Sequence, residues 1–413
     1  MSAPAPLPLS GVRVIDLTRI LSGPFCSMIL GDLGAEVVKI ETPGGDPVRK
    51  QGHRVEGLSW YFAGFNRNKS SVELDLRNPE GVAVLERLLA GADILTENFR
   101  PGILDRMGLT EERLRQINPE LIVVSVNGYG SDGPYADRPA FDFIAQAMSG
   151  YMATNGTPDT GPLRTAPPIT DVVAGLYAAL GAVAALRGRE NGGPAQRVEA
   201  SMMMSMMSML AYLTSNALAT GRDPVPTGND HPIASPYGLF RASDGDIAVA
   251  PSTDRIVEKF LGELGLGHLL TDPRFASNEV RLRHRAELNA LINEALAHDT
   301  QEGWITRLNA AGVPSGRVQS VTEALADPQV AAQDMVLRVP HEGRGEVGMI
   351  GFPVKFSKTP LQVRHPTPEL GAGGRDALRT AGFDEAEIDA LVAARRAGRR
   401  NHLRRCRNRA PQP

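Results

Sequence analysis

Hydrophobic residues in the first half of the chain fall into short blocks whose spacing alternates between that of strands and that of helices. Apolar and polar side chains alternate clearly over Ser71–Leu76, which predicts a strand. Asn78 and Pro79 then begin a predicted helix that runs to about Leu89, because Asn caps helices and Pro is tolerated in the first turn. Further strands are predicted over 12–17, 35–40, 93–97 and 121–126, and a further helix over 25–33. This alternation predicts an α/β fold with a parallel sheet covered by helices, in which ligands bind at the carboxyl ends of the strands.

A longer apolar helix is predicted from Asp171 to about Arg187, directly after the pair Pro167-Pro168. Either Thr170 or Asp171 can cap this helix. The run after Asp171 has almost no polar side chain, so we expect the helix to be buried nearly all round. Asp171 is then a carboxylate held on a rigid element, which suits a nucleophile, although these residues alone also fit a purely capping role.

The second half of the chain has a different pattern. A short strand is predicted at 196–200, a Met-rich core helix at 201–209, a Gly- and Pro-rich working loop at 221–236, a hairpin around Ser243-Asp244-Gly245, helices over 254–309, and a last strand and terminal helix within 350–395. We therefore predict a large α/β domain with a parallel sheet and a smaller second domain. The predicted parts are 1–224 (large domain), 225–325 (small domain), 326–394 (return to the large domain) and 395–413 (an Arg-rich disordered tail).

Composition narrows the classes of partner. The 413 residues carry a net charge of −3, with 42% apolar and 22% charged residues, which is typical of a globular protein with a sizeable core. This charge predicts no general attraction to nucleic acid or to anionic membranes. Cys26 and Cys406 offer neither a disulfide framework nor a metal-binding spacing. No signal peptide and no uninterrupted membrane-spanning run is evident, so we expect a cytoplasmic protein without metal.

Familiar cofactor motifs are missing or out of context. Gly128–Gly133 matches GxGxxG, but Pro134 follows and no helix starts there, so NAD and FAD are excluded. The ends of predicted strands instead carry cations, among them Arg19, Arg77 and Arg106, and Arg is suited to bidentate phosphate contact. Each of these cations could equally be an ordinary surface charge. Among the histidines, only His231 lies in the working loop.

Several motifs occur in a fixed order from near residue 8: Leu9–Arg19, Gly23-Pro24, Leu30–Glu41, Asn68-Lys69-Ser70, Leu74-Asp75-Leu76, Glu97–Gly102, Pro236-Tyr237-Gly238 and Ser243-Asp244-Gly245. In this order they resemble the family III CoA-transferases, the group that includes formyl-CoA:oxalate and carnitine CoA-transferases. The resemblance extends to about residue 390 and is stronger in the first half.

The resemblance implies that Asp171 is the catalytic nucleophile and that two chains form an interlocked homodimer. It also implies that each chain has a large Rossmann-like CoA-binding domain and a smaller α+β domain. It implies a reaction that moves CoA from an acyl-CoA thioester to a free carboxylic acid, through mixed anhydrides and an aspartyl-CoA thioester, with coenzyme A as substrate and with no metal or redox cofactor. The residues that it places near CoA are Thr18, Arg19, Leu74, Arg77, Asn98, Phe99, Arg106 and Met107.

Two other functions remain open on the sequence. A 2-methylacyl-CoA racemase is similar in fold, but its second base is a His where this chain has Phe141, and Phe cannot exchange a proton. A CoA-binding scaffold without turnover is the other alternative. For the substrate, Arg164 and His231 are the candidate residues, and a cation at Arg164 favours a dicarboxylic acyl group.

Overall fold

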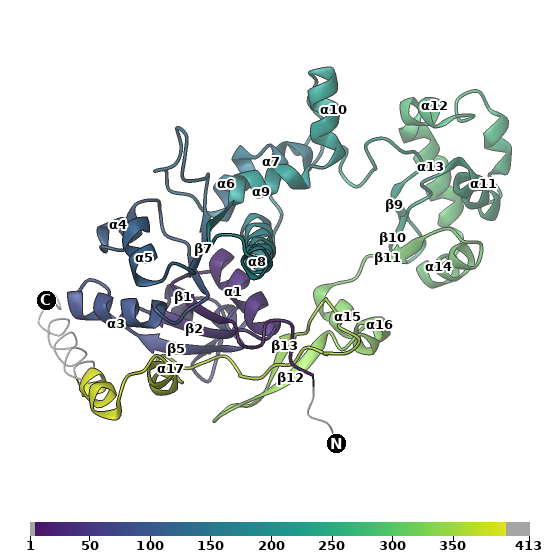
Figure 1. Cartoon of the computed structure of the whole chain (residues 1–413). Coiled ribbons are helices and arrows are strands. Elements are labelled where there is room, and N and C mark those ends of the chain that lie inside the picture. The colour runs from purple at the N-terminus through teal and green to yellow at the C-terminus, as the bar shows by residue number, and fades with distance from the viewer. Residues whose placement is uncertain (1–4, 394–413) are drawn as a thin grey trace, which may run out of the picture. The chain divides into compact units, whose positions relative to one another are not determined.

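A computed structural model of the chain describes residues 5–393 (Figure 1). The predicted tail at 395–413 lies outside the described residues. Contacts divide the described residues into two compact units, one formed by residues 5–149, 165–211 and 333–393, and the other by 150–164 and 212–332. The boundaries proposed from the sequence, including the small domain at 225–325, stay predictions.

The first unit is built on a six-stranded sheet in which every neighbouring pair of strands is parallel. Its strands lie in the order β5-β2-β1-β6-β7-β8, so the order reverses between β1 and β6, where α/β sheets bind ligands. Their bounds are β1 Arg13–Asp16, β2 Glu36–Glu41, β5 Lys69–Glu73, β6 Ile94–Glu97, β7 Ile122–Asn127 and β8 Arg197–Ser201. This arrangement confirms the predicted α/β class and its parallel sheet.

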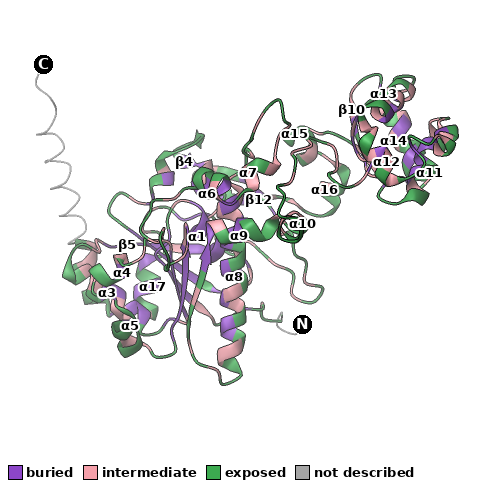
Figure 2. Cartoon of the chain, turned by 90° about the horizontal axis from the view of Figure 1, so that it is seen from above, coloured by how far each residue is buried: buried purple, intermediate pink, exposed green. Residues whose placement is uncertain are grey.

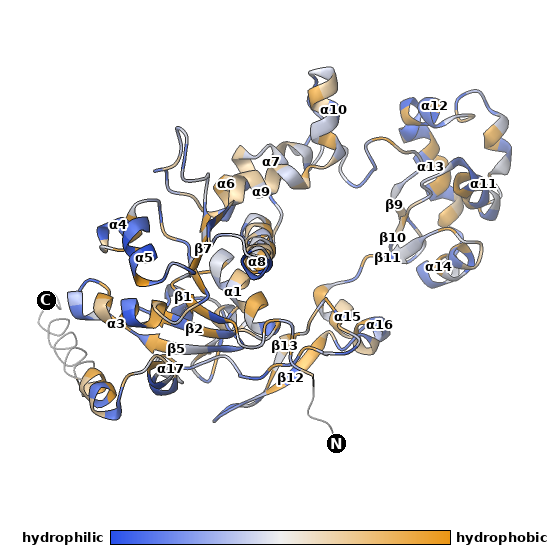
Figure 3. Ribbon diagram, in the orientation of Figure 1, coloured by the Kyte–Doolittle hydropathy of each residue, from blue (hydrophilic) through white to orange (hydrophobic). Residues whose placement is uncertain are grey.

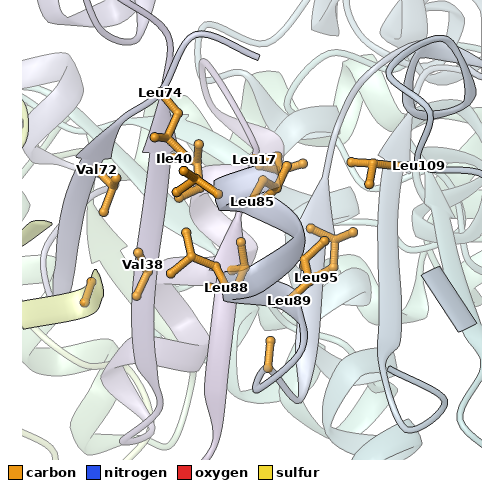
Figure 4. Close-up of a cluster of buried hydrophobic side chains, with 14 of the residues drawn as sticks. Leu17, Val38, Ile40, Val72, Leu74, Leu85, Leu88, Leu89, Leu95 and Leu109 are labelled. Atoms are coloured by element: carbon orange, nitrogen blue, oxygen red, sulfur yellow. The ribbon is translucent and has the colours of Figure 1, made fainter. Parts of the chain in front are cut away.

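Helices cover both faces of this sheet (Figure 1). On one face, leucines of α3 (Pro79–Leu89) lie over strand residues such as Val38 and Leu95 in a buried cluster (Figure 4). On the other face, α1 (Ser22–Asp32) and α8 (Ile169–Glu190) pack against β7 in a second buried cluster. The other helices of this unit are α2 Trp60–Ala63, α4 Ile103–Arg106, α5 Glu111–Ile117, α6 Asp142–Met148, α9 Met202–Met209 and α17 Gly374–Thr380.

The second unit has its own core around a small antiparallel sheet in the order β11-β10-β9. Its strands are β9 Gly238–Arg241, β10 Asp246–Val249 and β11 Ser315–Arg317, so the hairpin predicted around residues 243–245 is confirmed. Its helices are α7 Tyr151–Thr154, α10 Tyr212–Thr220, α11 Asp254–Glu263, α12 Asn278–Arg283, α13 Arg285–Leu296, α14 Gln301–Ala310, α15 Val321–Leu325 and α16 Pro328–Ala332.

The end of the described chain differs from its prediction. The predicted last strand within 350–395 is absent from the described part of that range, whereas an unpredicted hairpin precedes it, formed by β12 (Val336–His341) and β13 (Gly345–Ile350). A shorter hairpin pairs β3 (Arg54–Val55) with β4 (Leu58–Ser59). Residues 385–393 are helical, as predicted.

Helix α8 also departs from expectation. It is not buried all round in the single chain, and Figure 2 shows exposed and partly buried stretches along it. Leu176, Tyr177 and Leu180 are exposed. By length and composition it is apolar enough to cross a membrane, with a mean hydropathy of 1.8, although we expected no such run. Half of its most apolar stretch is buried in the protein, and it packs against α1, β7 and β8, which is the environment of a core helix.

Candidate active site

Asp171 lies in the first turn of α8 and does not cap it. The helix begins at Ile169 with Pro168 at the N-cap position, where no side chain makes a capping hydrogen bond. A residue from another helix accepts the hydrogen bonds of the first turn. Asp142 Oδ1 of α6 accepts from the backbone N–H of Thr170 at 2.9 Å and from the Thr170 hydroxyl at 2.9 Å. Both capping assignments made from the sequence were therefore wrong, and the Asp171 carboxylate is left available for another role.

Helix α1 brings Ser22 against the same turn of α8. Asp171 and Gly175 are four residues apart and so share one face of the helix. At Gly175 a Cβ atom would lie only 2.4 Å from the Ser22 carbonyl oxygen, so only glycine permits this approach. The buried Ser22 side chain forms a hydrogen bond with Asp171. The close packing of α8 on α1 thus fixes the Asp171 carboxylate beside Ser22.

The environment of Asp171 favours its neutral form more than water does. Burial, followed by the negative charge of Asp142, raises the pKa of Asp171 to about 7, and the hydrogen bond with Ser22 opposes this shift. Tyr61 of α2 is also close to Asp171. Burial, followed by the charges of Asp171, Asp46 and Asp142, raises the pKa of Tyr61. A carboxyl group with such a pKa changes its charge near neutral pH, which is the behaviour of a functional group rather than of a simple helix cap.

A cavity of about 450 Å³ opens at the carboxyl ends of β1, β2 and β6, near the reversal of strand order. It brings together six of the eight residues predicted to lie near CoA: Thr18, Arg19, Arg77, Phe99, Arg106 and Met107. The other two lie elsewhere: Leu74 is in the core cluster under α3 (Figure 4), and Asn98 holds the backbone of Arg19. Their contact with CoA stays a prediction.

The charges around this cavity suit a polyanion. Arg19 lies over the ring of Phe99 at 5.5 Å, and Arg100 and Arg106 also line the wall. Within residues 5–393, none of these three arginines forms an ion pair with a carboxylate. Guanidinium groups that keep their donors available can bind phosphate in a bidentate manner. The cavity can therefore hold a phosphorylated ligand beside an aromatic ring.

Asp171 does not line this cavity, but one short segment connects the two. The β1–α1 loop, Leu17–Leu21, carries Thr18 and Arg19 in the cavity wall and leads directly into Ser22. The sequence pointed to Arg19 but missed Ser22, Tyr61, Asp142 and Asp46 as parts of this region. No sequence pattern marks Asp142, because its partner Thr170 lies 28 residues further along the chain.

The two predicted substrate residues belong to the second unit. Arg164 is exposed, and its segment is tied to the working loop by a hydrogen bond from the Gly228 N–H to the Gly156 carbonyl at 2.7 Å. His231 is half-buried beside Tyr212 and Tyr237, with ring centroids 6.2 and 4.6 Å away. Burial and then the charge of Arg285 lower the pKa of His231. The segments of Arg164 and His231 meet, whereas their roles toward a substrate stay predictions.

In the described part of the chain, no group of three or more His, Cys, Asp or Glu side chains is arranged to hold a metal ion. The site consists instead of a half-buried carboxyl group with a pKa of about 7 and a cationic cavity, linked by one loop.

Comparison with known proteins agrees with this arrangement. The chain is 36% identical over 372 residues to the succinate–glutarate CoA-transferase of Agrobacterium fabrum, covering 88% of this chain and 93% of that one. It is 37% identical to the succinyl-CoA–D-citramalate CoA-transferase of Chloroflexus aurantiacus, covering 94% and 98%. The acetyl-CoA:oxalate CoA-transferase of Acetobacter aceti is 39% identical, with 85% and 89% covered.

A solved structure and a family model point the same way. The crystal structure of a CAIB/BAIF family protein from Brucella suis matches with a TM-score of 0.81 and 37% identity, over 91% of this chain and all of that one. The model of CoA-transferase family III matches residues 9–373. The chain therefore belongs to CoA-transferase family III.

Proposed function

We propose that the protein moves CoA from an acyl-CoA thioester to a free carboxylic acid, with Asp171 as the nucleophile. The observation that carries this proposal is the state of Asp171: its helix is capped by Asp142, its carboxylate is held by Ser22, and its pKa is about 7. A carboxylate held in this way can attack a carbonyl carbon. Partial burial of a carboxylate beside another acid is unfavourable for folding, so a purely structural role does not explain this placement.

The reaction can be written with this carboxylate alone. An Asp171 oxygen attacks the thioester carbonyl, the C–S bond breaks, and a mixed anhydride and CoA thiolate result. The thiolate then attacks the aspartyl carbonyl, which releases the donor acid and leaves an aspartyl-CoA thioester. The acceptor carboxylate attacks that thioester, giving a second anhydride and thiolate. Attack of the thiolate on the acceptor's carbonyl forms the new acyl-CoA and restores Asp171.

The two alternatives give different products. In the racemase reading, a base is needed where Phe141 stands, and this exposed side chain cannot supply one. In the scaffold reading, neither exchange nor racemisation occurs. Incubation of the protein with succinyl-CoA and a labelled dicarboxylic acid, and in parallel with a chiral 2-methylacyl-CoA, separates the three: we expect label to enter the acyl-CoA pool in the first mixture and chirality to be retained in the second. Loss of chirality without exchange would establish the racemase, and no reaction the scaffold.

The pH dependence of the reaction is expected to report Asp171. Only the carboxylate attacks, and the pKa of Asp171 is about 7, so kcat/KM for the acyl-CoA should fall about tenfold per pH unit on the acid side of that value. Initial rates of exchange measured across neutral pH test this. The variant Asp142→Asn removes the repelling charge, so its acid limb should move to lower pH. A profile that is flat through neutrality would rule out Asp171 as the titrating nucleophile.

The acyl group is proposed to carry a second carboxylate. Relatives named for succinate, glutarate, citramalate and oxalate support this, as does the cation at Arg164. We expect succinyl-CoA to be a good donor. Arg164→Leu should lower kcat/KM for succinyl-CoA by the equivalent of about 2–3 kcal/mol of transition-state stabilisation, the scale of a charged hydrogen bond. Arg255→Leu, another exposed arginine of the second unit, is the control. A donor screen in which only monocarboxylic acyl-CoA turns over would contradict the proposal.

We also propose that two chains interlock as a homodimer. Three helices of the first unit, α6, α8 and α9, pack together and carry many apolar residues (Figure 3). Their exposed apolar side chains are Phe143 and Ile144 of α6, Leu176, Tyr177 and Leu180 of α8, and Met204, Met207 and Met209 of α9. A second copy would cover this apolar face, and interlocked chains bury far more than a standard interface.

The expected assembly is a dimer that stays intact on dilution, as measured by sedimentation velocity. Leu180 is 63% exposed in the single chain, so Leu180→Glu should place a charge in the interface and reduce the dimer fraction. Val55→Glu, at an exposed apolar residue of the β3–β4 hairpin, is the matched control. A folded wild-type monomer at high dilution would contradict the proposed interlocking.

A further inference from the structure

The β1–α1 loop has an unusual backbone at Ile20. This β-branched residue has a φ of 70°, in the left-handed region that Ile rarely adopts. Such a conformation costs on the order of 1–3 kcal/mol and persists only where the surroundings hold it. Arg19, just before Ile20, lines the cavity, and Ser22, two residues after it, is hydrogen-bonded to Asp171.

Three polar side chains hold this loop. Lys39 Nζ donates to the Thr18 carbonyl at 2.7 Å. Asn98 both accepts from the Arg19 N–H and donates to the Arg19 carbonyl, each at 2.8 Å. The Asp46 carboxylate accepts from the N–H of Ile20 itself, at 3.2 and 3.3 Å. The strained residue is thus held by a carboxylate from the segment that follows β2.

Asp46 is an unexpected residue for this place. It is buried and, like Glu41, lines the wall of the arginine-rich cavity, where a carboxylate would repel a phosphorylated ligand. Its charge is balanced by Lys39, whose Nζ is 3.2 Å away, and it also accepts from the Val48 N–H at 3.1 Å. A role in binding an anionic ligand does not explain a carboxylate at this position. Its hydrogen bond from the Ile20 N–H does explain it.

We propose that Asp46 is a positioning residue that locks the β1–α1 loop, so that Arg19 faces the cavity while Ser22 stays on Asp171. This inference rests on the proposed function of Asp171 and the cavity. It predicts that the loop couples the cavity to Asp171, because one rigid turn positions both the Arg19 and the Ser22 side chains. Release of Ile20 from its left-handed conformation would move both at once.

The test uses the full-length protein. In Asp46→Ala the acceptor is lost, and kcat/KM for acyl-CoA is expected to fall about 100-fold, the scale of a displacement of roughly 1 Å at a reacting group. Asp46→Asn keeps an oxygen for the Ile20 N–H and should retain most activity. In the background of Asp46→Ala, Ile20→Gly makes the left-handed conformation accessible and should recover at least about tenfold. Asp32→Ala, which removes a buried ion pair with Arg67 at the far end of α1, controls for lost stability.

The acid limb of the pH profile gives a second readout. The titratable groups that face Asp171 are Asp142 and Tyr61, and none of these variants alters them. The hydrogen bond with Ser22 lowers the pKa of Asp171, so displacement of Ser22 would raise this pKa. Asp46→Ala should therefore move the acid limb to higher pH, and Asp46→Asn should not.

Either an unshifted limb in Asp46→Ala or a failure of Ile20→Gly to recover activity overturns the positioning role. Should Asp46→Ala not fold, Asp46→Glu displaces the carboxylate by one methylene and should give the same loss and the same shift. Near wild-type exchange in Asp171→Ala would instead overturn the proposed function itself, so the two failures are distinct.

Discussion

Replacement of Asp171 by alanine is expected to abolish CoA transfer while CoA still binds. The substitution removes the proposed nucleophile, and losses of a nucleophile in acyl transfer reach about 10⁴-fold or more in kcat. The arginine-lined cavity does not include Asp171, so the affinity for CoA should persist. The helix should also persist, because its first turn is held by Asp142 rather than by Asp171. Exchange kinetics and calorimetric titration with CoA measure the two effects separately.

A matched control is Asp376→Ala, which removes an exposed aspartate from the first turn of α17 and should leave transfer unchanged. Wild-type protein mixed with acyl-CoA should also be inactivated by hydroxylamine, which cleaves anhydrides and thioesters, whereas protein without acyl-CoA should not. Near wild-type exchange by Asp171→Ala would refute the nucleophile, whatever the result with CoA.

The sheet and its ligand edge could be predicted from the sequence because their signals are local. Alternation over Ser71–Leu76 and the Asn78-Pro79 helix start are properties of neighbouring residues, and β5 and α3 lie where they indicated. Since parallel strands end at a common edge, cations that follow different strands were expected to meet. Arg19, Arg77 and Arg106 do line one cavity.

What the sequence could not supply are contacts between distant segments. The cap of α8 comes from Asp142, so no rule about neighbouring residues could place it, and two nearby candidates were chosen instead. The exposed face of α8 carries the apolar residues Leu176, Tyr177 and Leu180, and its buried face is apolar as well, so periodicity could not distinguish a core contact from a surface that another chain would cover. The carboxylate of Asp46 was missed for a similar reason, since its partner Ile20 lies 26 residues earlier.

The largest expected effect on stability comes from Asp16, at the end of β1. Its buried carboxylate is paired with Lys69 Nζ at 3.2 Å and accepts from Ser27 Oγ at 2.7 Å and from the Thr18 N–H at 2.9 Å. Asp16→Ala leaves the Lys69 charge buried without its partner, which typically costs about 3–5 kcal/mol. Urea denaturation followed by circular dichroism should show the transition of the first unit at markedly lower urea.

Paired substitutions and pH identify the cause of that loss. The double variant Asp16→Leu, Lys69→Met removes both charges, so it should recover much of the stability that Asp16→Ala loses. A buried ion pair often contributes little net stability, whereas a single unpaired buried charge is costly. Glu111→Ala, which breaks an exposed pair with Arg115, should cost less than about 1 kcal/mol.

Burial alone would raise the pKa of Asp16, but the charges of Lys69 and Lys39 and the hydrogen bonds from Thr18 and Ser27 outweigh it and lower the pKa to about 2. A carboxyl group whose pKa is lowered by folding contributes stability above its ordinary pKa of 3.8 and loses it as the pH falls through about 2. The wild-type protein should therefore lose this contribution between these pH values, whereas Asp16→Ala, which lacks the group, should show a smaller loss there. Equal acid sensitivity in both proteins, or no recovery in the double variant, would mean that the network is not what stabilises this end of the sheet.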